Sequence, residues 1–393
     1  MPFWRGLRRP RASSAALAIY DDVFPCSLSG FRLTEYTEIL RAYPTAAVYS
    51  TLSSLGLLGV ADQADDIVAD WRNHNPDLSE RLHIISAAED LPPAGAYYTV
   101  FLNNAFDLAP IVESRNARFS FTLYPGGGLA LDEAATSKLR RVLNSPALDQ
   151  VIVTQPVVKS HLVDDLRFDP ERIVYVYGVV LPPREVLPLR PAAHPLALGF
   201  AAHKYHPQGL DKGLDIFVDA VAQVASKGIP LTCHMVGPWT PADVAEIPGV
   251  RWVLHGAVDG QRLPEVLREI DVCIFPTRAG LLGPGSFDGY PTGSAIEAGL
   301  AGCLVMTTNP LAQVTPLRPG RDLEEVAPDP ESVAAAVLRI VQQPAQWLDG
   351  RRRQTMQAMD GLFAVDTQMT PRHQVLRRLI ELSADTDRRA RGT

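Results

Sequence analysis

Residues 286–308 read SFDGYPTGSAIEAGLAGCLVMTT, and the predicted fold follows from this stretch. The apolar run from Cys303 to Met306 predicts a buried strand. Residues 294–301 before it predict a short helix that ends at Gly302. Nearly all residues of this helix are small, and glycine lowers helix propensity. Close packing of the helix against a sheet is therefore one explanation of the composition.

The same stretch carries two carboxylates, Asp288 on the turn before the helix and Glu297 about one turn inside it. Between them, Gly289, Pro291 and Gly293 allow backbone N–H groups to approach a ligand. A helix N-terminus attracts phosphate, and carboxylates suit sugar hydroxyls. A phosphate flanked by acids that bind hydroxyls describes a nucleotide-sugar, which is the second explanation.

Composition narrows the class of protein. A chain of 393 residues is long for one hydrophobic core, which favours two domains. The net charge of −7 argues against a general nucleic-acid binder. The four cysteines are scattered without metal-ligand spacing, and we interpret them as reduced thiols of a cytoplasmic protein. No apolar run approaches the roughly 18 residues that a membrane-spanning helix needs.

The first residues, MPFWRGLRRPRASS, are basic and include Phe3 and Trp4. We interpret them as a frayed tail, with weak contact to an anionic membrane surface as the alternative. The expected localisation is cytoplasmic, either free or at the inner face of the membrane.

Predicted strands alternate with predicted helices in both halves of the chain, which favours two Rossmann-like α/β domains facing a central cleft. In the first half, Gly30 follows the first strand, and Tyr124 with Gly126 and Gly127 follows the strand at 119–123. These positions belong at the carboxyl edge of a sheet, where ligands bind in such folds. Simple turn glycines are the alternative at both places.

A proline-rich stretch at residues 183–194 predicts the linker between the domains. The expected division is an acceptor-side domain at 1–182, a donor-binding domain at 195–370, and a C-terminal helix at 371–393 that packs back on the first domain.

A loop in the second domain brings His203, Lys204 and Lys212 to the start of a predicted helix. Lysine is a good point charge for phosphate, and cations there stabilise a leaving diphosphate. Solvated loop lysines are the alternative. His203 and His206 lack an evident third ligand, so no metal site is predicted.

Several ordered motifs carry a family resemblance. They are Lys212-Gly213, Met235-Val236-Gly237, His255-Gly256-Ala257-Val258, Asp271 to Thr277, and Asp288-Gly289-Tyr290-Pro291-Thr292 to Glu297-Ala298. Together they resemble the donor domain of retaining GT-B glycosyltransferases of the glycosyl transferases group 1 family. The resemblance covers residues 151 to the C-terminus, and the earlier residues fit an acceptor domain more loosely.

The resemblance implies the site residues. Glu297 corresponds to the residue that binds the nucleotide ribose, Asp288 to the first acid of the family's Glu-x7-Glu motif, and Lys212 to a diphosphate ligand; these three are the expected catalytic set. The remaining donor-binding positions are His203, Lys204, Gly237, Pro238, Ala257, Val258, Gly289, Tyr290, Pro291, Thr292 and Gly293. The expected acceptor side holds Gly30, Tyr124, Gly126 and Gly127.

The sequence departs from the family pattern at three places. The first acid is Asp, one residue farther from Glu297 than in the family. The Arg usual before Lys-Gly is absent, with His203 or Lys204 as its replacement. Tyr124 and a glycine triplet stand where many relatives carry a His.

The resemblance implies sugar transfer from a nucleotide-diphosphate-sugar to a glycan, lipid-linked or small-molecule hydroxyl, with retention, and without a metal or another cofactor. Polysaccharide biosynthesis is the expected setting. Two alternatives remain open: a sugar-nucleotide epimerase of the same fold, and a catalytically silent subunit of a polysaccharide-assembly complex.

Overall fold

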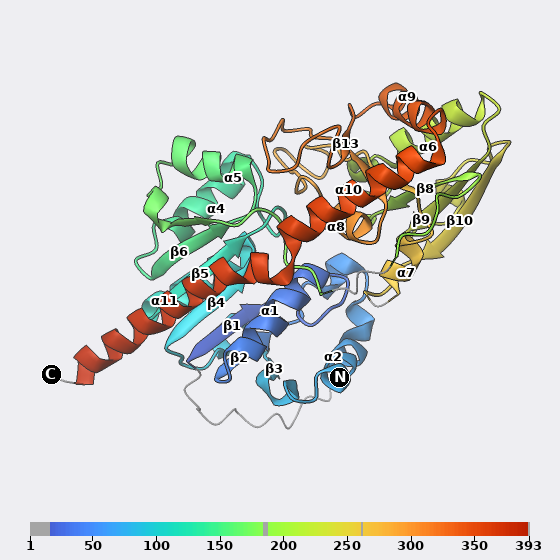
Figure 1. The fold of residues 1–393 in the computed structure, drawn as a ribbon. Coiled ribbons are helices and arrows are strands. Elements are labelled where there is room, and N and C mark those ends of the chain that lie inside the picture. The colour runs from blue at the N-terminus through green and yellow to red at the C-terminus, as the bar shows by residue number, and fades with distance from the viewer. Residues whose placement is uncertain (1–15, 184–187, 261, 392–393) are drawn as a thin grey trace.

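The computed structural model describes residues 16–183, 188–260 and 262–391, and side chains up to residue 384. The basic segment at residues 1–14, and with it the alternative of membrane contact, lies outside this part of the chain. Two α/β domains lie side by side, each built on its own parallel sheet (Figure 1). This confirms the predicted fold class.

The first domain has a seven-stranded parallel sheet in the order β3-β2-β1-β4-β5-β6-β7. The strands are β1 (Leu17–Asp21), β2 (Ala46–Ser50), β3 (Leu82–Ile84), β4 (Ala96–Val100), β5 (Arg118–Leu123), β6 (Leu148–Val153) and β7 (Ile173–Tyr175). The helices are α1 (Gly30–Ala42), α2 (Ala64–His74), α3 (Leu102–Ser114), α4 (Glu133–Leu143) and α5 (Pro156–Ser160). Strands β1, β2 and β4 are buried along their whole length, as expected where both faces of a parallel sheet are covered.

The second domain repeats this plan with a six-stranded sheet in the order β10-β9-β8-β11-β12-β13. The strands are β8 (Leu196–Ala201), β9 (Leu231–Val236), β10 (Val250–Gly256), β11 (Val272–Phe275), β12 (Leu304–Thr307) and β13 (Glu324–Glu325). The helices are α6 (Leu214–Ala225), α7 (Leu263–Leu267), α8 (Gly293–Leu300), α9 (Pro330–Val341) and α10 (Ala345–Phe363). In both domains the strand order reverses beside the first strand, which is the topological switch point where open α/β sheets bind ligands.

The sequence did not predict α10, because its buried face mixes apolar residues with arginines. Arg351 and Arg352 are buried on this helix, as are Leu348, Met359 and Phe363. The Arg352 side chain donates to the carbonyl oxygens of Gly302 (2.7 Å) and Arg190 (3.0 Å). Buried arginines interrupt the apolar periodicity by which an amphipathic helix is predicted.

The last helix, α11 (Val365–Arg391), leaves the second domain and runs along the first (Figure 1). It begins before residue 371, where the sequence placed the start of the C-terminal helix. Its apolar residues Met369, Val375, Leu376 and Leu379 belong to the core of the first domain.

A fully buried arginine joins α11 to that core. Arg372 lies 3.4 Å from the Glu35 carboxylate of α1 and donates to the Tyr124 hydroxyl at 2.8 Å. Tyr124 in turn donates to Glu35 at 2.6 Å. A buried charge of this kind needs its partner, because an unpaired one is costly to desolvate.

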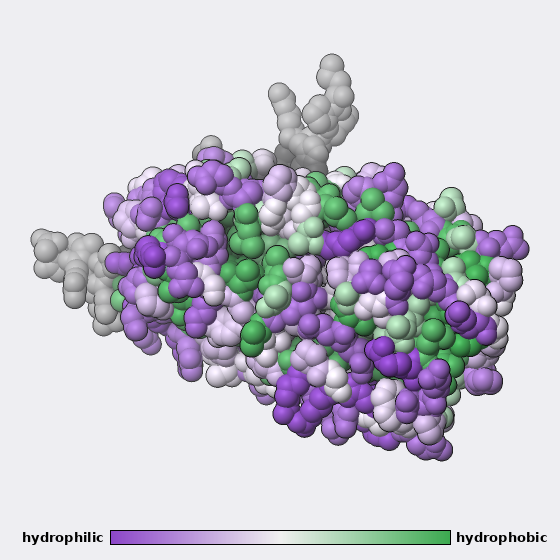
Figure 2. Space-filling view, turned by 90° about the horizontal axis from the view of Figure 1, so that it is seen from above, coloured by the Kyte–Doolittle hydropathy of each residue, from purple (hydrophilic) through white to green (hydrophobic). Residues whose placement is uncertain are grey.

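None of the helices in the described ranges is long and apolar enough to cross a bilayer. Seen from above, the surface is mainly hydrophilic, and apolar residues lie in separate patches (Figure 2).

The contacts of α11 give a stability prediction. Replacing Arg372 by Met should lower the free energy of unfolding of the first domain by about 3–5 kcal/mol, because Glu35 loses its buried counter-charge. The control is Arg378→Met on the same helix, whose side chain is 57% exposed beside Asp149 and should cost at most about 1 kcal/mol. Urea denaturation followed by circular dichroism measures both. Equal effects would contradict the structural role given to Arg372.

Candidate active site

A cleft of about 460 Å³ opens between the two domains. One wall comes from the second domain, where the chain leaves β8, β9 and β10, and from the start of α8. The other wall comes from the first domain, mainly from the start of α1 and the end of α2. The cleft therefore lies at the carboxyl edge of the second sheet, beside its switch point, as the sequence predicted.

Six predicted donor-binding or catalytic positions line the second-domain wall: His203, Gly237, Pro238, Ala257, Val258 and Glu297. The backbone turns sharply here. Gly237 has a φ of 130°, and a Cβ on it would lie 2.0 Å from the carbonyl oxygen of Ala202. Only glycine fits, so the segments after β8 and β9 approach each other closely at this point of the wall.

Helix α8 presents its N-terminal turn to the cleft. Its N-cap Thr292 accepts a hydrogen bond from the backbone N–H of Ala295 at 3.2 Å. Ser294 and the half-buried Glu297 line the cleft. The helix start and one carboxylate therefore face the same space, as the second explanation of this stretch requires.

Close packing explains only part of the small residues of α8. A Cβ on Gly299 would lie 2.7 Å from Met359 of α10, so this glycine is needed for packing. A Cβ on Gly293 would meet no atom within 4 Å, so packing does not require glycine there.

Lys212 and Asp288 form an ion pair. The Lys212 Nζ lies 2.7 Å and 2.9 Å from the two carboxylate oxygens of Asp288, and 3.6 Å from Asp211. Burial alone would lower the pKa of Lys212, but the carboxylate of Asp288 outweighs burial and the net shift is upward. Lys212 therefore stays charged although it is only 8% exposed.

The glycine after Lys212 fixes its position. Gly213 has a φ of 74°, and a Cβ there would lie 2.0 Å from the carbonyl oxygen of Pro276. The Lys-Gly pair of the sequence motif thus reflects a backbone contact with the loop after β11.

Several predicted residues do not line the cleft in this structure. Lys204 pairs with Asp243 and lies over the Trp239 ring at 5.6 Å. Tyr124 is only 1% exposed and forms hydrogen bonds with Glu35 and Arg372. The prediction that it lies on the acceptor side of the cleft is therefore wrong, and Tyr124 belongs to the core of the first domain. The hydrogen bonds of the Tyr124 hydroxyl are made with Glu35 and Arg372 and not with groups in the cleft.

The glycine triplet forms a turn on its own domain. Gly126 and Gly127 have φ values of 81° and 53°. A Cβ on Gly127 would lie 2.4 Å from the Phe101 ring. The simple turn, which was the alternative explanation, describes these glycines, whereas Gly30 does line the cleft.

The turn at 288–293 is held from the first domain. Tyr177 donates to the carbonyl oxygen of Tyr290 at 2.7 Å, and Gln155 accepts from the Tyr290 N–H at 3.0 Å. Tyr290 is buried, and Gly289, Tyr290, Pro291, Thr292 and Gly293 lie beside the cleft without lining it. The turn that carries Asp288 therefore depends on the position of the other domain.

A charged cluster at the end of β1 was not among the predicted site residues. Asp21 is fully buried and accepts from the N–H groups of Val23 (2.8 Å) and Phe24 (2.6 Å). Arg32 bridges Asp21 at 2.8 Å and Asp22 at 2.6 Å. The cluster fixes the loop before α1 that supplies part of the cleft wall. The adjacent acids at the end of an apolar run were the only available signal.

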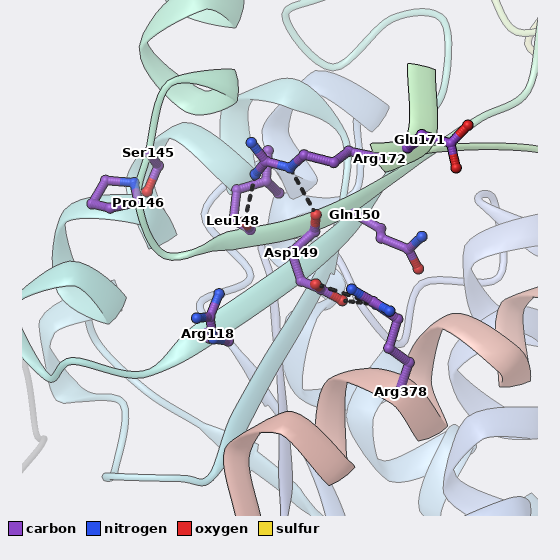
Figure 3. A pocket seen from close by; sticks show the side chains of 9 residues that line it. All are labelled: Arg118, Ser145, Pro146, Leu148, Asp149, Gln150, Glu171, Arg172 and Arg378. Carbon is purple, nitrogen blue, oxygen red and sulfur yellow. Dashed lines mark hydrogen bonds and ion pairs between the residues drawn. The ribbon is translucent and has the colours of Figure 1, made fainter. Parts of the chain in front are cut away.

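A second, smaller pocket of about 260 Å³ lies at the opposite, amino edge of the first sheet (Figure 3). Arg172 donates to the carbonyl oxygens of Leu148 (2.5 Å) and Asp149 (3.1 Å), while Arg378 pairs with the Asp149 carboxylate. The pocket lies away from the switch point at the carboxyl edge, so it is not the candidate active site.

The comparisons with known proteins fit the geometry of the larger cleft. Residues 198–343 match the family model described as glycosyl transferases group 1. The matched residues make up most of the second domain. A sequence search of curated proteins found no significant match.

Solved structures resemble nearly the whole chain. The sucrose-phosphate synthase of Thermosynechococcus elongatus has 16% identity and a TM-score of 0.60, covering 93% of this chain and 99% of that one. Anabaena HepE in complex with UDP-glucose has 13% identity and a TM-score of 0.64, covering 92% and 99%. A UDP-forming trehalose-phosphate synthase from Burkholderia xenovorans has 11% identity and a TM-score of 0.60, covering 94% and 99%. The two-domain arrangement of this chain is the GT-B fold.

The two glycines of α8 give a test of the site. Gly293→Ala should leave the midpoint of thermal unfolding unchanged or raised, because the new methyl group meets open space and alanine favours helix by about 1 kcal/mol. Gly299→Ala should lower the midpoint, because Met359 has to move. Equal destabilisation by the two substitutions would contradict the division of roles along α8.

Proposed function

We propose that this protein transfers a sugar from a nucleotide-diphosphate-sugar to an acceptor hydroxyl, with retention of configuration and without a metal. One observation carries the proposal: Glu297 and the N-terminal turn of α8 face a cleft that the ends of β8, β9 and β10 frame with backbone. A helix N-terminus suits the diphosphate, and a carboxylate suits the ribose hydroxyls.

The wall beyond α8 suits the nucleotide base. Gly237, Pro238, Ala257 and Val258 form a surface without charged side chains after β9 and β10. A planar base can lie against such a wall and hydrogen-bond to its backbone. With the base there and the ribose at Glu297, the diphosphate lies toward the start of α8, and the sugar toward Asp288.

In this proposal Lys212 pairs with Asp288 when no donor is bound and with the donor diphosphate when it is. Without donor, Asp288 balances its buried charge. When the diphosphate binds, it supplies stronger negative charge, so Lys212 turns to the phosphates and Asp288 is released toward the sugar hydroxyls. This exchange requires closure of the cleft, because Lys212 and Asp288 do not line it in this structure.

The proposed transfer breaks the bond between the anomeric carbon and a diphosphate oxygen. The acceptor oxygen forms its bond on the same face of the sugar, and its proton passes to an oxygen of the leaving diphosphate. The protein positions the reactants and stabilises the leaving charge through Lys212 and the α8 N-terminus. These groups take the part that a metal ion plays in other transferases.

The first-domain wall suits a polar acceptor with an apolar portion. Ser27, Asp70, His74 and Asn75 offer hydrogen-bonding groups, and Trp71 and Leu28 are among the apolar residues beside them. We propose a glycan, a lipid-linked sugar or a small polyol as acceptor, in cytoplasmic polysaccharide biosynthesis. The structures containing UDP and UDP-glucose support UDP-sugars as the first donors to try.

The roles of two side chains are directly testable. Glu297→Gln and Lys212→Met should each lower kcat/KM for the donor by about 100-fold or more, because each removes a charge placed on the donor. The matched control is Glu331→Gln, an exposed glutamate on α9 that should leave kcat/KM unchanged. Circular dichroism and thermal unfolding check that each variant is folded. Near-normal rates in folded Glu297→Gln or Lys212→Met would reject the assignment of that residue.

A further inference from the structure

Three side chains of the kinds that bind metals converge in the second domain, outside the proposed donor site. His234 lies on β9, His255 on β10, and Glu269 just after α7. His234 lies two residues before Val236, and His255 lies two residues before Ala257; both of these later residues line the cleft. Successive side chains alternate between the faces of a strand, so His234 shares the face of Val236, which packs with Leu267 of α7.

The distances fit a single ion. The Nδ1 of His234 lies 3.0 Å from the Nε2 of His255, and 3.8 Å from the Oε2 of Glu269. All three ligand atoms lie within 4.8 Å of one another. Two imidazole nitrogens on one tetrahedral zinc ion, each at about 2.0–2.1 Å from it, are about 3.3 Å apart. The two nitrogens already lie within a few tenths of an ångström of that spacing, and metal binding requires the rings to turn from their mutual hydrogen bond toward the ion.

We propose that His234, His255 and Glu269 bind one Zn²⁺ ion, or a transition metal of similar ligand preference. Two imidazoles and a carboxylate are a ligand set that zinc accepts, with water in the fourth position. The Glu269 side chain is 63% exposed, so solvent can reach that position. Within the parts of the chain that the structure describes, no other group of three such side chains meets this spacing.

The ion would hold the edge of the sheet together. Strand β10 is the last strand of the sheet and pairs only with β9. A metal bound by β9, β10 and the segment after α7 ties this edge to the helix that covers it. The same edge carries Ala257 and Val258 into the cleft. The role is therefore structural, and it does not depend on the proposed reaction.

The experiment uses the full chain, treated with EDTA and desalted. Calorimetric titration with Zn²⁺ should give one site per chain, and Co²⁺ should give the visible absorption of a low-symmetry complex. His255→Gln removes a ligand and should weaken Zn²⁺ binding by more than about 100-fold. Loss of a residue that only hydrogen-bonds to a metal ligand weakens binding by at most about 100-fold. Glu269→Gln, at an exposed position, should weaken it as well. The control His83→Gln, in the first domain, should bind as the wild type does.

Thermal unfolding separates binding from folding. Zn²⁺ should raise the unfolding midpoint of the wild type and of His83→Gln, but not that of His255→Gln. The proposal is wrong if the wild type does not bind Zn²⁺ stoichiometrically. It is also wrong if Zn²⁺ binding is unchanged in His255→Gln and Glu269→Gln. Either result would show that the two histidines form only a hydrogen bond. Sugar transfer should proceed equally in the zinc-free and zinc-loaded protein. Transfer that stops in EDTA would contradict the metal-free mechanism and leave the zinc site standing.

Discussion

The buried charge of Lys212 needs a counter-charge in every state of the protein, and this constraint organises the donor site. Gly213 holds the lysine against the loop after β11, and Asp288, which is 76 residues farther along the chain, supplies the counter-charge. The turn carrying Asp288 is in turn fixed by Tyr177 and Gln155 of the first domain. One ion pair therefore links the loop that carries Lys212, the turn before α8 and the relative position of the domains. A donor diphosphate competes for the same lysine, so donor binding and domain closure are coupled in the proposed mechanism.

The fold places the site before any side chain is considered. Both sheets are parallel with the same order around their first strand, so each has its switch point at the carboxyl edge. The cleft uses that edge of the second sheet directly, through the segments after β8, β9 and β10. The first domain contributes helices and a loop that the buried Asp21–Arg32 pair holds in place. Helix α11 then returns to the first domain, and Arg372 anchors it there.

Much of this could be predicted from sequence because the signals were local. The strand predicted from Cys303 to Met306 is β12 (Leu304–Thr307), because its apolar run has clear ends. Gly237 and Ala257 were named through the family resemblance, and Glu297 through its place in the helix after the glycine-containing turn. Helix α10 was missed because buried arginines interrupt its apolar face, and β13 is too short to leave a pattern.

The rest of the site depends on contacts between distant segments. Lys204 and Lys212 are equivalent as loop lysines in the sequence. Their ion-pair partners, Asp243 and Asp288, lie far along the chain and place the two side chains differently. Tyr124 follows a strand as a site residue does, but Glu35 and Arg372 draw it into the core. The closeness of His234 and His255 follows from the register of β9 and β10, which sequence periodicity does not fix.

The central claim is that the second-domain cleft binds a nucleotide-diphosphate-sugar for transfer. Its most direct test is calorimetric titration of the full chain with a panel of nucleotide-sugars, followed by measurement of nucleoside diphosphate released with and without acceptors. The account predicts that at least one nucleotide-sugar binds with one site per chain, competes with its nucleoside diphosphate, and releases that diphosphate as sugar appears on an acceptor. Failure of every nucleotide-sugar and nucleoside diphosphate to bind the folded protein would contradict the account.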